Sequence, residues 1–153
     1  MGKKSIFYLK RVFNWQFMPY RYHHFLFGSC TKSVETISGL GLLGFAFVFW
    51  LDGSRLVQYP IYIKFQHAPL WLIIALFGVV GLAQVVALWW DSARSNIISG
   101  YLLIMAAMLW FMTGVAFGSG YPPANTGMVF PPLMAVACTL VGHNVVCRAK
   151  SQV

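Results

Sequence analysis

Few side chains in this sequence could do chemistry, and His143 is the most suggestive of them. It stands in an apolar stretch, next to Asn144 and about one helical turn before Arg148. An ionisable side chain inside a membrane span is by default a candidate for function, because its charged form is costly in hydrocarbon. An imidazole there could bind haem or relay protons. The alternative is a structural histidine close enough to the interface to reach water.

A haem in a helical bundle would need a second axial ligand at the depth of His143. The other histidines do not supply one, because His67 is expected on the opposite side of the membrane and His23 and His24 belong to an N-terminal segment. We therefore keep His143 as the one candidate cofactor ligand and favour its structural interpretation. We expect no resident cofactor and no metal site.

The acidic residues are Glu35, Asp52 and Asp91, and each stands at the boundary of an apolar stretch. So few carboxylates, all at boundaries, argue against an ion pump that works with carboxylates. Glu35 suits the N-terminal end of a helix and could pair with Lys32 or, across a bundle, with Arg148. The sequence also lacks a Ser-His-Asp set, an HExxH motif and a phosphate-binding glycine loop. We therefore expect no enzyme.

Three cysteines complete the set of reactive side chains: Cys30, Cys138 and Cys147. They form no CxxC motif, and the charge distribution described below places Cys30 and Cys147 near the cytoplasmic face. We expect free thiols.

Four apolar stretches must position these side chains, at 36–51, 69–90, 97–118 and 129–147. An α-helix needs about 20 predominantly apolar residues to cross the bilayer core, and the second and third stretches meet this requirement outright. Hydrophobic residues make up 59% of the chain and charged residues 9%, which excludes a water-soluble domain. The expected fold is all-α: a polytopic membrane protein with four transmembrane helices in an up-down-up-down bundle.

The two shorter stretches can be lengthened by their neighbours. Residues 33–35 would add a first turn to the first span, and the Pro131-Pro132 pair would start the fourth, because the first residues of a helix need no N–H partner. Between the first two spans, residues 52–68 are rich in Tyr, Ile and Phe, and we expect a short helix there at the membrane surface. The second and third spans should form an antiparallel hairpin.

Basic residues are distributed unevenly among the connections. Nine of the eleven Lys and Arg residues lie before the first span, between the second and third, or after the fourth, and the other two are Arg55 and Lys64. By the positive-inside rule, both termini are cytoplasmic and the loops 52–68 and 119–128 face outward. The net charge of +8 is then mostly a signature of topology, and we expect no nucleic-acid partner.

The chain is expected to have three parts: a basic, aromatic segment at 1–32, the four-helix transmembrane domain at 33–148 and a cytoplasmic tail at 149–153. The first part interleaves aromatic and basic residues, a pattern typical of a segment that lies at headgroup depth. Such an anchor is favoured over an arm that binds a partner. The residues expected to contact lipid headgroups are Lys3, Lys4, Lys10, Arg11, Trp15 and Arg21.

Small residues in the first two spans predict close helix packing. They let helix backbones approach in lipid, where no hydrophobic drive joins the helices. Gln84, late in the second span, needs a hydrogen-bond partner, either in the same subunit or in a neighbouring one. The glycines expected to pack the helices are Gly39, Gly41, Gly44, Gly78 and Gly81.

The run from Trp50 to Val146 carries a pattern that goes beyond hydropathy. A first span ending in aromatic residues is followed by a polar loop with a tyrosine before Ala68-Pro69-Leu70-Trp71. Then come a Gly-Leu-Ala-Gln stretch at 81–84, a Trp-Phe pair at 110–111, and an Asn-Thr-Gly link with prolines before the last span. Over about two thirds of the chain, this pattern resembles a loose group of small, holin-like four-helix inner-membrane proteins encoded by tailed bacteriophages.

The resemblance implies a phage-encoded protein of the bacterial inner membrane, with the lipid bilayer, further copies of itself and a host or phage membrane protein as partners. Two functions compete within it: a holin-like oligomer that opens a lesion, and an interaction protein that blocks superinfection or senses envelope disturbance. Through His143, a haem-binding or accessory subunit of a respiratory complex is the alternative. We expect a non-enzymatic, oligomeric membrane protein and leave lesion and interaction open.

Overall fold

A computed structural model describes residues 30–89, 93–120 and 126–150. By its internal contacts the chain divides into two compact units, Met1–Thr31 and Lys32–Val153. Apart from Cys30 and Thr31, the described residues belong to the second unit, and the described residues contain no strand. The residues expected at the lipid headgroups lie outside the described residues; they are Lys3, Lys4, Lys10, Arg11, Trp15 and Arg21.

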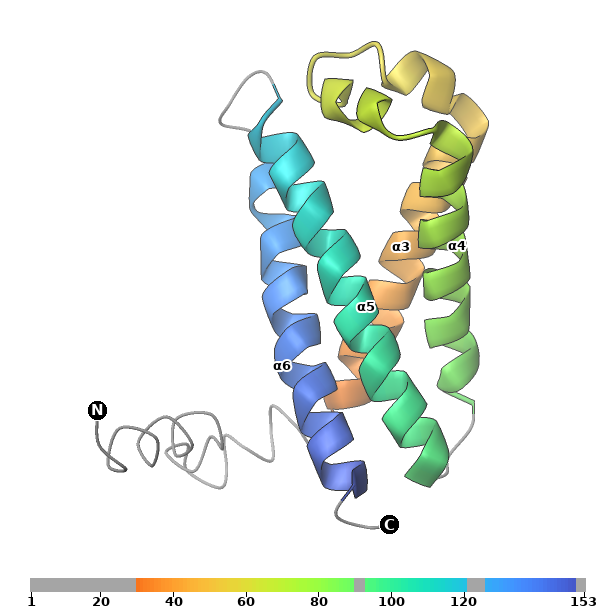
Figure 1. The fold of residues 1–153 in the computed structure, drawn as a ribbon, viewed down its shortest axis with the longest axis vertical. Coiled ribbons are helices and arrows are strands. Elements are labelled where there is room, and N and C mark those ends of the chain that lie inside the picture. Colours follow the sequence, from red (N-terminus) through yellow and green to blue (C-terminus); the bar gives the residue numbers. More distant parts are fainter. Residues whose placement is uncertain (1–29, 90–92, 121–125, 151–153) are drawn as a thin grey trace, which may run out of the picture. The chain divides into compact units, whose positions relative to one another are not determined.

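Four long helices alternate in direction along the chain (Figure 1). Each is long and apolar enough to cross a membrane, which confirms the predicted all-α class with four spans and is consistent with a membrane location. Two short 3-10 helices, η2 (Ile63–His67) and η3 (Thr126–Met128), lie in the connections. The long helices are α3 (Cys30–Leu56), α4 (Leu70–Ala87), α5 (Ala93–Gly118) and α6 (Phe130–Lys150).

Helix α3 is longer than the apolar stretch at 36–51 that predicted it. It takes in residues 33–35 as expected, and it continues beyond Asp52 to Leu56. Asp52 has non-helical backbone angles (φ −141°, ψ 22°), so the helix is kinked there. Arg55 lies 3.6 Å from Asp52 as an exposed ion pair. The kink therefore marks the end of the apolar part of the helix.

The other helix boundaries follow the prolines and the predicted hairpin. Helix α6 begins at Phe130 and has Pro131 and Pro132 in its first turn, where a missing N–H costs nothing. Helix α4 ends at Ala87 and α5 begins at Ala93, so the second span ends and the third begins earlier than predicted. Helices α4 and α5 lie antiparallel and in contact (Figure 1).

We call the end of the bundle at which α3 begins and α6 ends the base, and the end with η2 and η3 the cap (Figure 1). Aromatic rings pack at the cap. The ring centroid of Phe65 on η2 lies 5.1 Å from that of Phe49 on α3 and 5.8 Å from that of Phe117 on α5. The short helix predicted within residues 52–68 is thus present as η2, and its Phe65 is buried against two spans.

Candidate functional site: a polar cluster inside the bundle

One polar side chain from each of the four long helices meets inside the bundle. The indole N–H of Trp110 on α5 donates to Ser38 Oγ on α3 over 3.0 Å, and the Ser38 hydroxyl donates to Gln84 Oε1 on α4 over 3.2 Å. The thiol of Cys138 on α6 lies beside Ser38. All four side chains are at most 2% exposed. We call these four residues the polar cluster; the hydrogen bonds among Ser38, Gln84 and Trp110 replace those to water, which a bilayer core does not offer.

Glycines allow these side chains to meet. A Cβ atom at Gly81 would lie 2.9 Å from the carbonyl oxygen of Gly39, so α3 and α4 touch through their backbones one turn from Gln84. A Cβ atom at Gly41 would lie 2.8 Å from Cζ2 of Trp110. The indole therefore occupies the space that the missing side chain leaves, and its N–H can reach α3.

The other glycines expected in packing have more room. A Cβ atom at Gly78 would find Ala46 at an ordinary 3.8 Å, and one at Gly44 would find nothing within 4 Å. A second close crossing was not predicted: a Cβ atom at Gly142 would lie 2.8 Å from the carbonyl oxygen of Gly100, so α5 and α6 also touch. The only sequence signal for it is a glycine in each of two apolar stretches.

The amide of Gln84 is half satisfied. Its Oε1 accepts the Ser38 hydrogen, whereas its Nε2 is buried and has no hydrogen-bond partner among the described residues. From the sequence, the partner of Gln84 could lie in the same subunit or in a neighbouring one. In the structure, the partner of the amide oxygen is Ser38 of the same chain. Asn144 Nδ2 on α6 is buried without a partner in the same way. Each unpaired buried polar group lowers the free energy of unfolding by about 1–3 kcal/mol. An apolar side chain at the same position would avoid this loss.

A second polar pair lies nearer the base. The Ser99 hydroxyl on α5 donates to the carboxylate of Glu35 on α3, and both side chains are buried. Glu35 stands one turn before Ser38, so it continues the polar face of α3 toward the base, where the charge of Lys32 acts on the carboxylate. The sequence predicts Lys32 or Arg148 as its partner. Ser99 was not predicted, because a serine within a span gives no sign of what it faces.

His143 lies outside the polar cluster and is exposed on α6 near the base. The Sγ atom of Cys147, one turn further, lies 3.7 Å from its Nε2 and 3.9 Å from its Nδ1. His67 belongs to η2 at the cap, so these two histidines lie at opposite ends of the bundle (Figure 1). Within the described ranges, no three His, Cys, Asp or Glu side chains gather closely enough to hold a metal ion.

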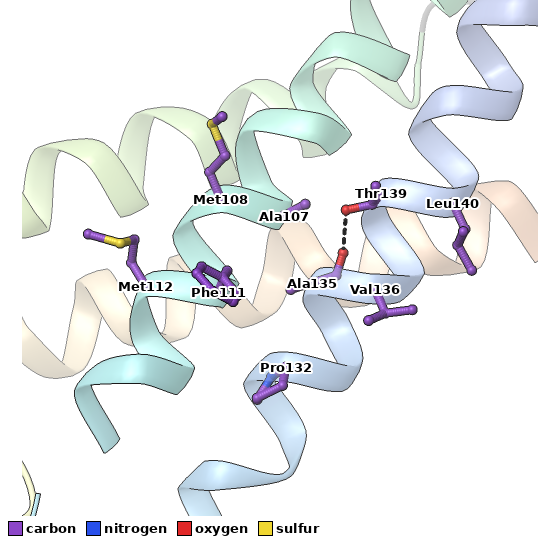
Figure 2. Close-up of a pocket in the computed structure, with 9 residues that line it drawn as sticks. All are labelled: Ala107, Met108, Phe111, Met112, Pro132, Ala135, Val136, Thr139 and Leu140. Carbon is purple, nitrogen blue, oxygen red and sulfur yellow. Dashed lines mark hydrogen bonds between the residues drawn. The ribbon is translucent and has the colours of Figure 1, made fainter. Parts of the chain in front are cut away.

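An open apolar groove of about 730 Å³ runs between α5 and α6 (Figure 2). The one hydroxyl in its lining belongs to Thr139 and donates to the carbonyl oxygen of Ala135 over 2.8 Å. The groove therefore presents only apolar contacts to a neighbour. Its walls include Met108, Phe111 and Met112 of α5 and Pro132, Val136 and Leu140 of α6.

Comparison of the chain with protein-family models, with curated proteins and with solved structures gives no match. The resemblance to phage-encoded four-helix proteins stays a prediction, and the geometry alone carries the functional argument. The polar cluster combines a hydroxyl, an amide, an indole and a thiol. None of these is a strong base at neutral pH, so hydrogen bonding between helices is what the cluster can do.

Proposed function

We propose that this chain is a non-enzymatic, oligomeric integral membrane protein that works by binding other proteins within the membrane. In keeping with the resemblance, we place it in a bacterial inner membrane as a phage-related protein. Blocking of superinfection and sensing of envelope disturbance are the roles that such binding would serve. The proposal is supported by the direction in which polar and apolar side chains point.

Polar side chains from three of the helices point inward and pair there, and this is the observation that carries the proposal. Ser38, Gln84 and Trp110 are bonded to one another inside a single chain. A water-filled lesion would instead need polar groups on the outside of each bundle, where copies line the opening. On the outside, the four helices expose many large apolar side chains, such as Phe47, Val79, Met108 and Val136. Such a surface suits lipid and the apolar faces of other membrane proteins.

The orientation in the membrane belongs to the same proposal. Lys32 and Arg148 stand near the base, whereas Arg55 and Lys64 stand near the cap. With the further basic residues of the sequence counted, the positive-inside rule favours a cytoplasmic base and an outward-facing cap. The polar pair Glu35–Ser99 would then lie toward the cytoplasm.

Induced expression in a bacterial host, with growth and membrane potential recorded together, tests this function. We expect growth to continue with the potential intact, and protection from incoming phage without toxicity would identify the interaction. Collapse of the potential soon after induction would contradict it. Gly81→Leu, in which a side chain would press on the Gly39 backbone, is the control that identifies toxicity caused by misfolded protein.

One observation favours a lesion-forming oligomer as the second candidate. Gly44 is exposed on α3, and a Cβ atom there would meet nothing within 4 Å. A small residue facing lipid leaves room for the close approach of another copy. Under this candidate, Gly44→Leu would abolish the collapse of the potential on induction, whereas under the binding proposal it changes neither growth nor potential.

The haem-binding alternative gains no support from the described histidines, because His67 and His143 lie at opposite ends of the bundle. A haem needs its axial ligands on the two sides of one iron. The purified protein is therefore expected to be colourless, and a Soret band that disappears in His143→Ala would restore the alternative.

A further inference from the structure

The apolar groove between α5 and α6 has a floor of small side chains and a rim of larger ones (Figure 2). Ala107 and Ala135 line the groove and are buried, so they form its floor. Met108 and Met112 of α5 and Val136 of α6 line it as well but are exposed, so they form its rim. The groove is therefore a furrow that follows the contact between the two helices and opens to the side.

Close crossings hold the two helices together at both ends of the groove. At its cap end, a Cβ atom at Gly114 would lie 2.8 Å from Cγ of Pro132. Toward the base, a Cβ atom at Gly142 would lie 2.8 Å from the carbonyl oxygen of Gly100. The groove cannot widen without breaking one of these contacts. A chain of methylene groups can enter it, whereas a helix, about 10–12 Å across with its side chains, can only lie on its rim.

The groove covers the depth of one leaflet of the bilayer. Its lining residues on α6 run from Pro132 to Leu140, and the helix begins at Phe130. At a rise of about 1.5 Å per residue, Pro132 lies about 3 Å and Leu140 about 15 Å along the helix. The hydrocarbon core is about 30 Å thick, so one leaflet contributes about 15 Å. The groove therefore runs from the cap-side edge of the hydrocarbon to its midplane, the depth that the acyl chains of one leaflet occupy.

Beyond the groove, the exposed face of α6 becomes polar. The next exposed residues after Leu140 are His143 and Cys147. A transmembrane helix of another protein would cross the whole membrane and pass these side chains, whereas an acyl chain ends at the midplane, before it reaches them. The hydroxyl of Thr139 donates to the carbonyl oxygen of Ala135, so the groove offers no free donor to a polar side chain. Both observations favour an acyl chain as the occupant.

The charges near the groove indicate the kind of headgroup. Residues 118–133 carry no charged side chain, and η3, which contacts α5 and α6, belongs to this segment. The basic residues near the cap, Arg55 and Lys64, belong to α3 and η2 instead. A lipid whose chain lies in the groove has its headgroup beside η3. An uncharged surface there matches a headgroup without net charge and gives an anionic headgroup no advantage.

We propose that this groove is a lipid site, in which one acyl chain of a zwitterionic phospholipid from the cap-side leaflet lies between α5 and α6 and stays with the protein. Lipid tails are as apolar as the groove, so no hydrophobic drive holds the chain there. Van der Waals contacts hold it, because the floor and both walls surround the chain with fixed partner atoms. The flexible side chains of Met108 and Met112 can adjust to its shape. The inference goes beyond the proposed function, since it needs only the membrane and no protein partner.

The test counts phospholipid on the full-length chain by native mass spectrometry. The protein is taken into a mild detergent from nanodiscs that hold phosphatidylethanolamine and phosphatidylglycerol in equal amounts. We expect one retained phospholipid per chain, without enrichment of phosphatidylglycerol. Ala135→Leu and Thr139→Phe should each lose this lipid, because the larger side chains fill the groove. Thr139 is exposed, so its variant tests the site even if Ala135→Leu does not fold.

Ala75→Leu is the matched control, because it adds the same side chain as Ala135→Leu at an exposed position on α4, away from the groove. It should keep the lipid. A parent chain that retains no phospholipid, or a Thr139→Phe variant that retains as much as the parent, would overturn the proposal. A parent dimer that Thr139→Phe converts to a monomer would also overturn it, because a second copy would then cover the groove. Enrichment of phosphatidylglycerol would contradict the zwitterionic headgroup.

Discussion

The cap and the base hold the same four helices together by different means. At the cap, the ring centroid of Phe65 lies 5.1 Å from that of Phe49 and 5.8 Å from that of Phe117. Toward the base, α3 and α4 touch through glycine backbones, and a hydrogen bond joins Ser99 to Glu35. Between the two ends, the Trp110 indole donates to Ser38 and also packs edge-on against Phe45 and Phe130. Ring packing is thus prominent at the cap, where Gly120 also approaches the Ile61 backbone closely, and glycine crossings and polar contacts are prominent toward the base.

The difference follows from the kinds of side chain at each end, which are large aromatic rings at the cap and small residues toward the base. Large rings fill space and make many weak van der Waals contacts. The energies of these contacts add up, and they do not require the precise geometry that a hydrogen bond requires. Small residues bring backbones together, and only then can short polar side chains such as that of Ser38 reach the next helix. Loss of a hydrogen-bonding group should therefore lower the stability of the protein less at the cap than toward the base. Toward the base, removal of one donor or addition of one side chain at a glycine should lower stability measurably.

Phe49→Ala should give the largest loss of stability, because it removes a ring that is 1% exposed and contacts η2. Removal of a buried Phe costs about 3–5 kcal/mol in well-packed cores. Thermal unfolding in detergent measures the loss. Phe47→Ala, at a position 55% exposed on the same helix, is the control and should change stability little; equal losses in the two variants would show that the cap rings do not pack as described.

Gly81→Leu should come next, with a loss of about 1–3 kcal/mol from overpacking. The added side chain would press on the Gly39 carbonyl oxygen, 2.9 Å from the new Cβ atom. Gly44→Leu is the matched control, because it adds the same side chain where nothing lies within 4 Å. Resistance to proteolysis should fall in the first variant and stay constant in the second. If Gly44→Leu were the more damaging, the close crossing would lie on another face of α3.

Trp110→Phe should have a smaller effect, about 1–2 kcal/mol, because it removes the N–H that donates to Ser38 and part of the ring volume that fills the space beside Gly41. Unfolding by a denaturing detergent can resolve this difference. Trp89→Phe is the control at a position 83% exposed and should leave the unfolding curve in place. A Trp110→Phe variant as stable as the parent would mean that the base, like the cap, depends on ring packing.

The sequence predicted those features that follow from local composition. The lengths of the apolar stretches predicted the four spans, and the Pro131-Pro132 pair predicted where α6 begins. Gln84 was identified as a residue in need of a partner, because an amide in hydrocarbon is costly wherever it points. The kink at Asp52 was not predicted, since the apolar stretch simply ends there.

The partners within the candidate site were beyond prediction from sequence. Ser38, Ser99 and Cys138 are small residues that are common in membrane helices, and their contacts depend on how the helices are rotated about their axes. That rotation is set by the crossings at Gly81 and Gly142, where backbones of different helices meet. Hydropathy reports the length of a span and carries little information on which face meets which neighbour.

A double-mutant cycle of Ser38→Ala and Trp110→Phe tests whether Ser38 and Trp110 are hydrogen-bonded to each other within one chain, on which the description of the polar cluster depends. Unfolding is measured for the parent, the two single variants and the double variant, at high protein concentration and after dilution in detergent. We expect a coupling free energy of about 0.6–1.7 kcal/mol that does not change on dilution. Additive effects, or a coupling that disappears on dilution, would contradict it, because the partner of Ser38 would then be absent or would belong to another copy.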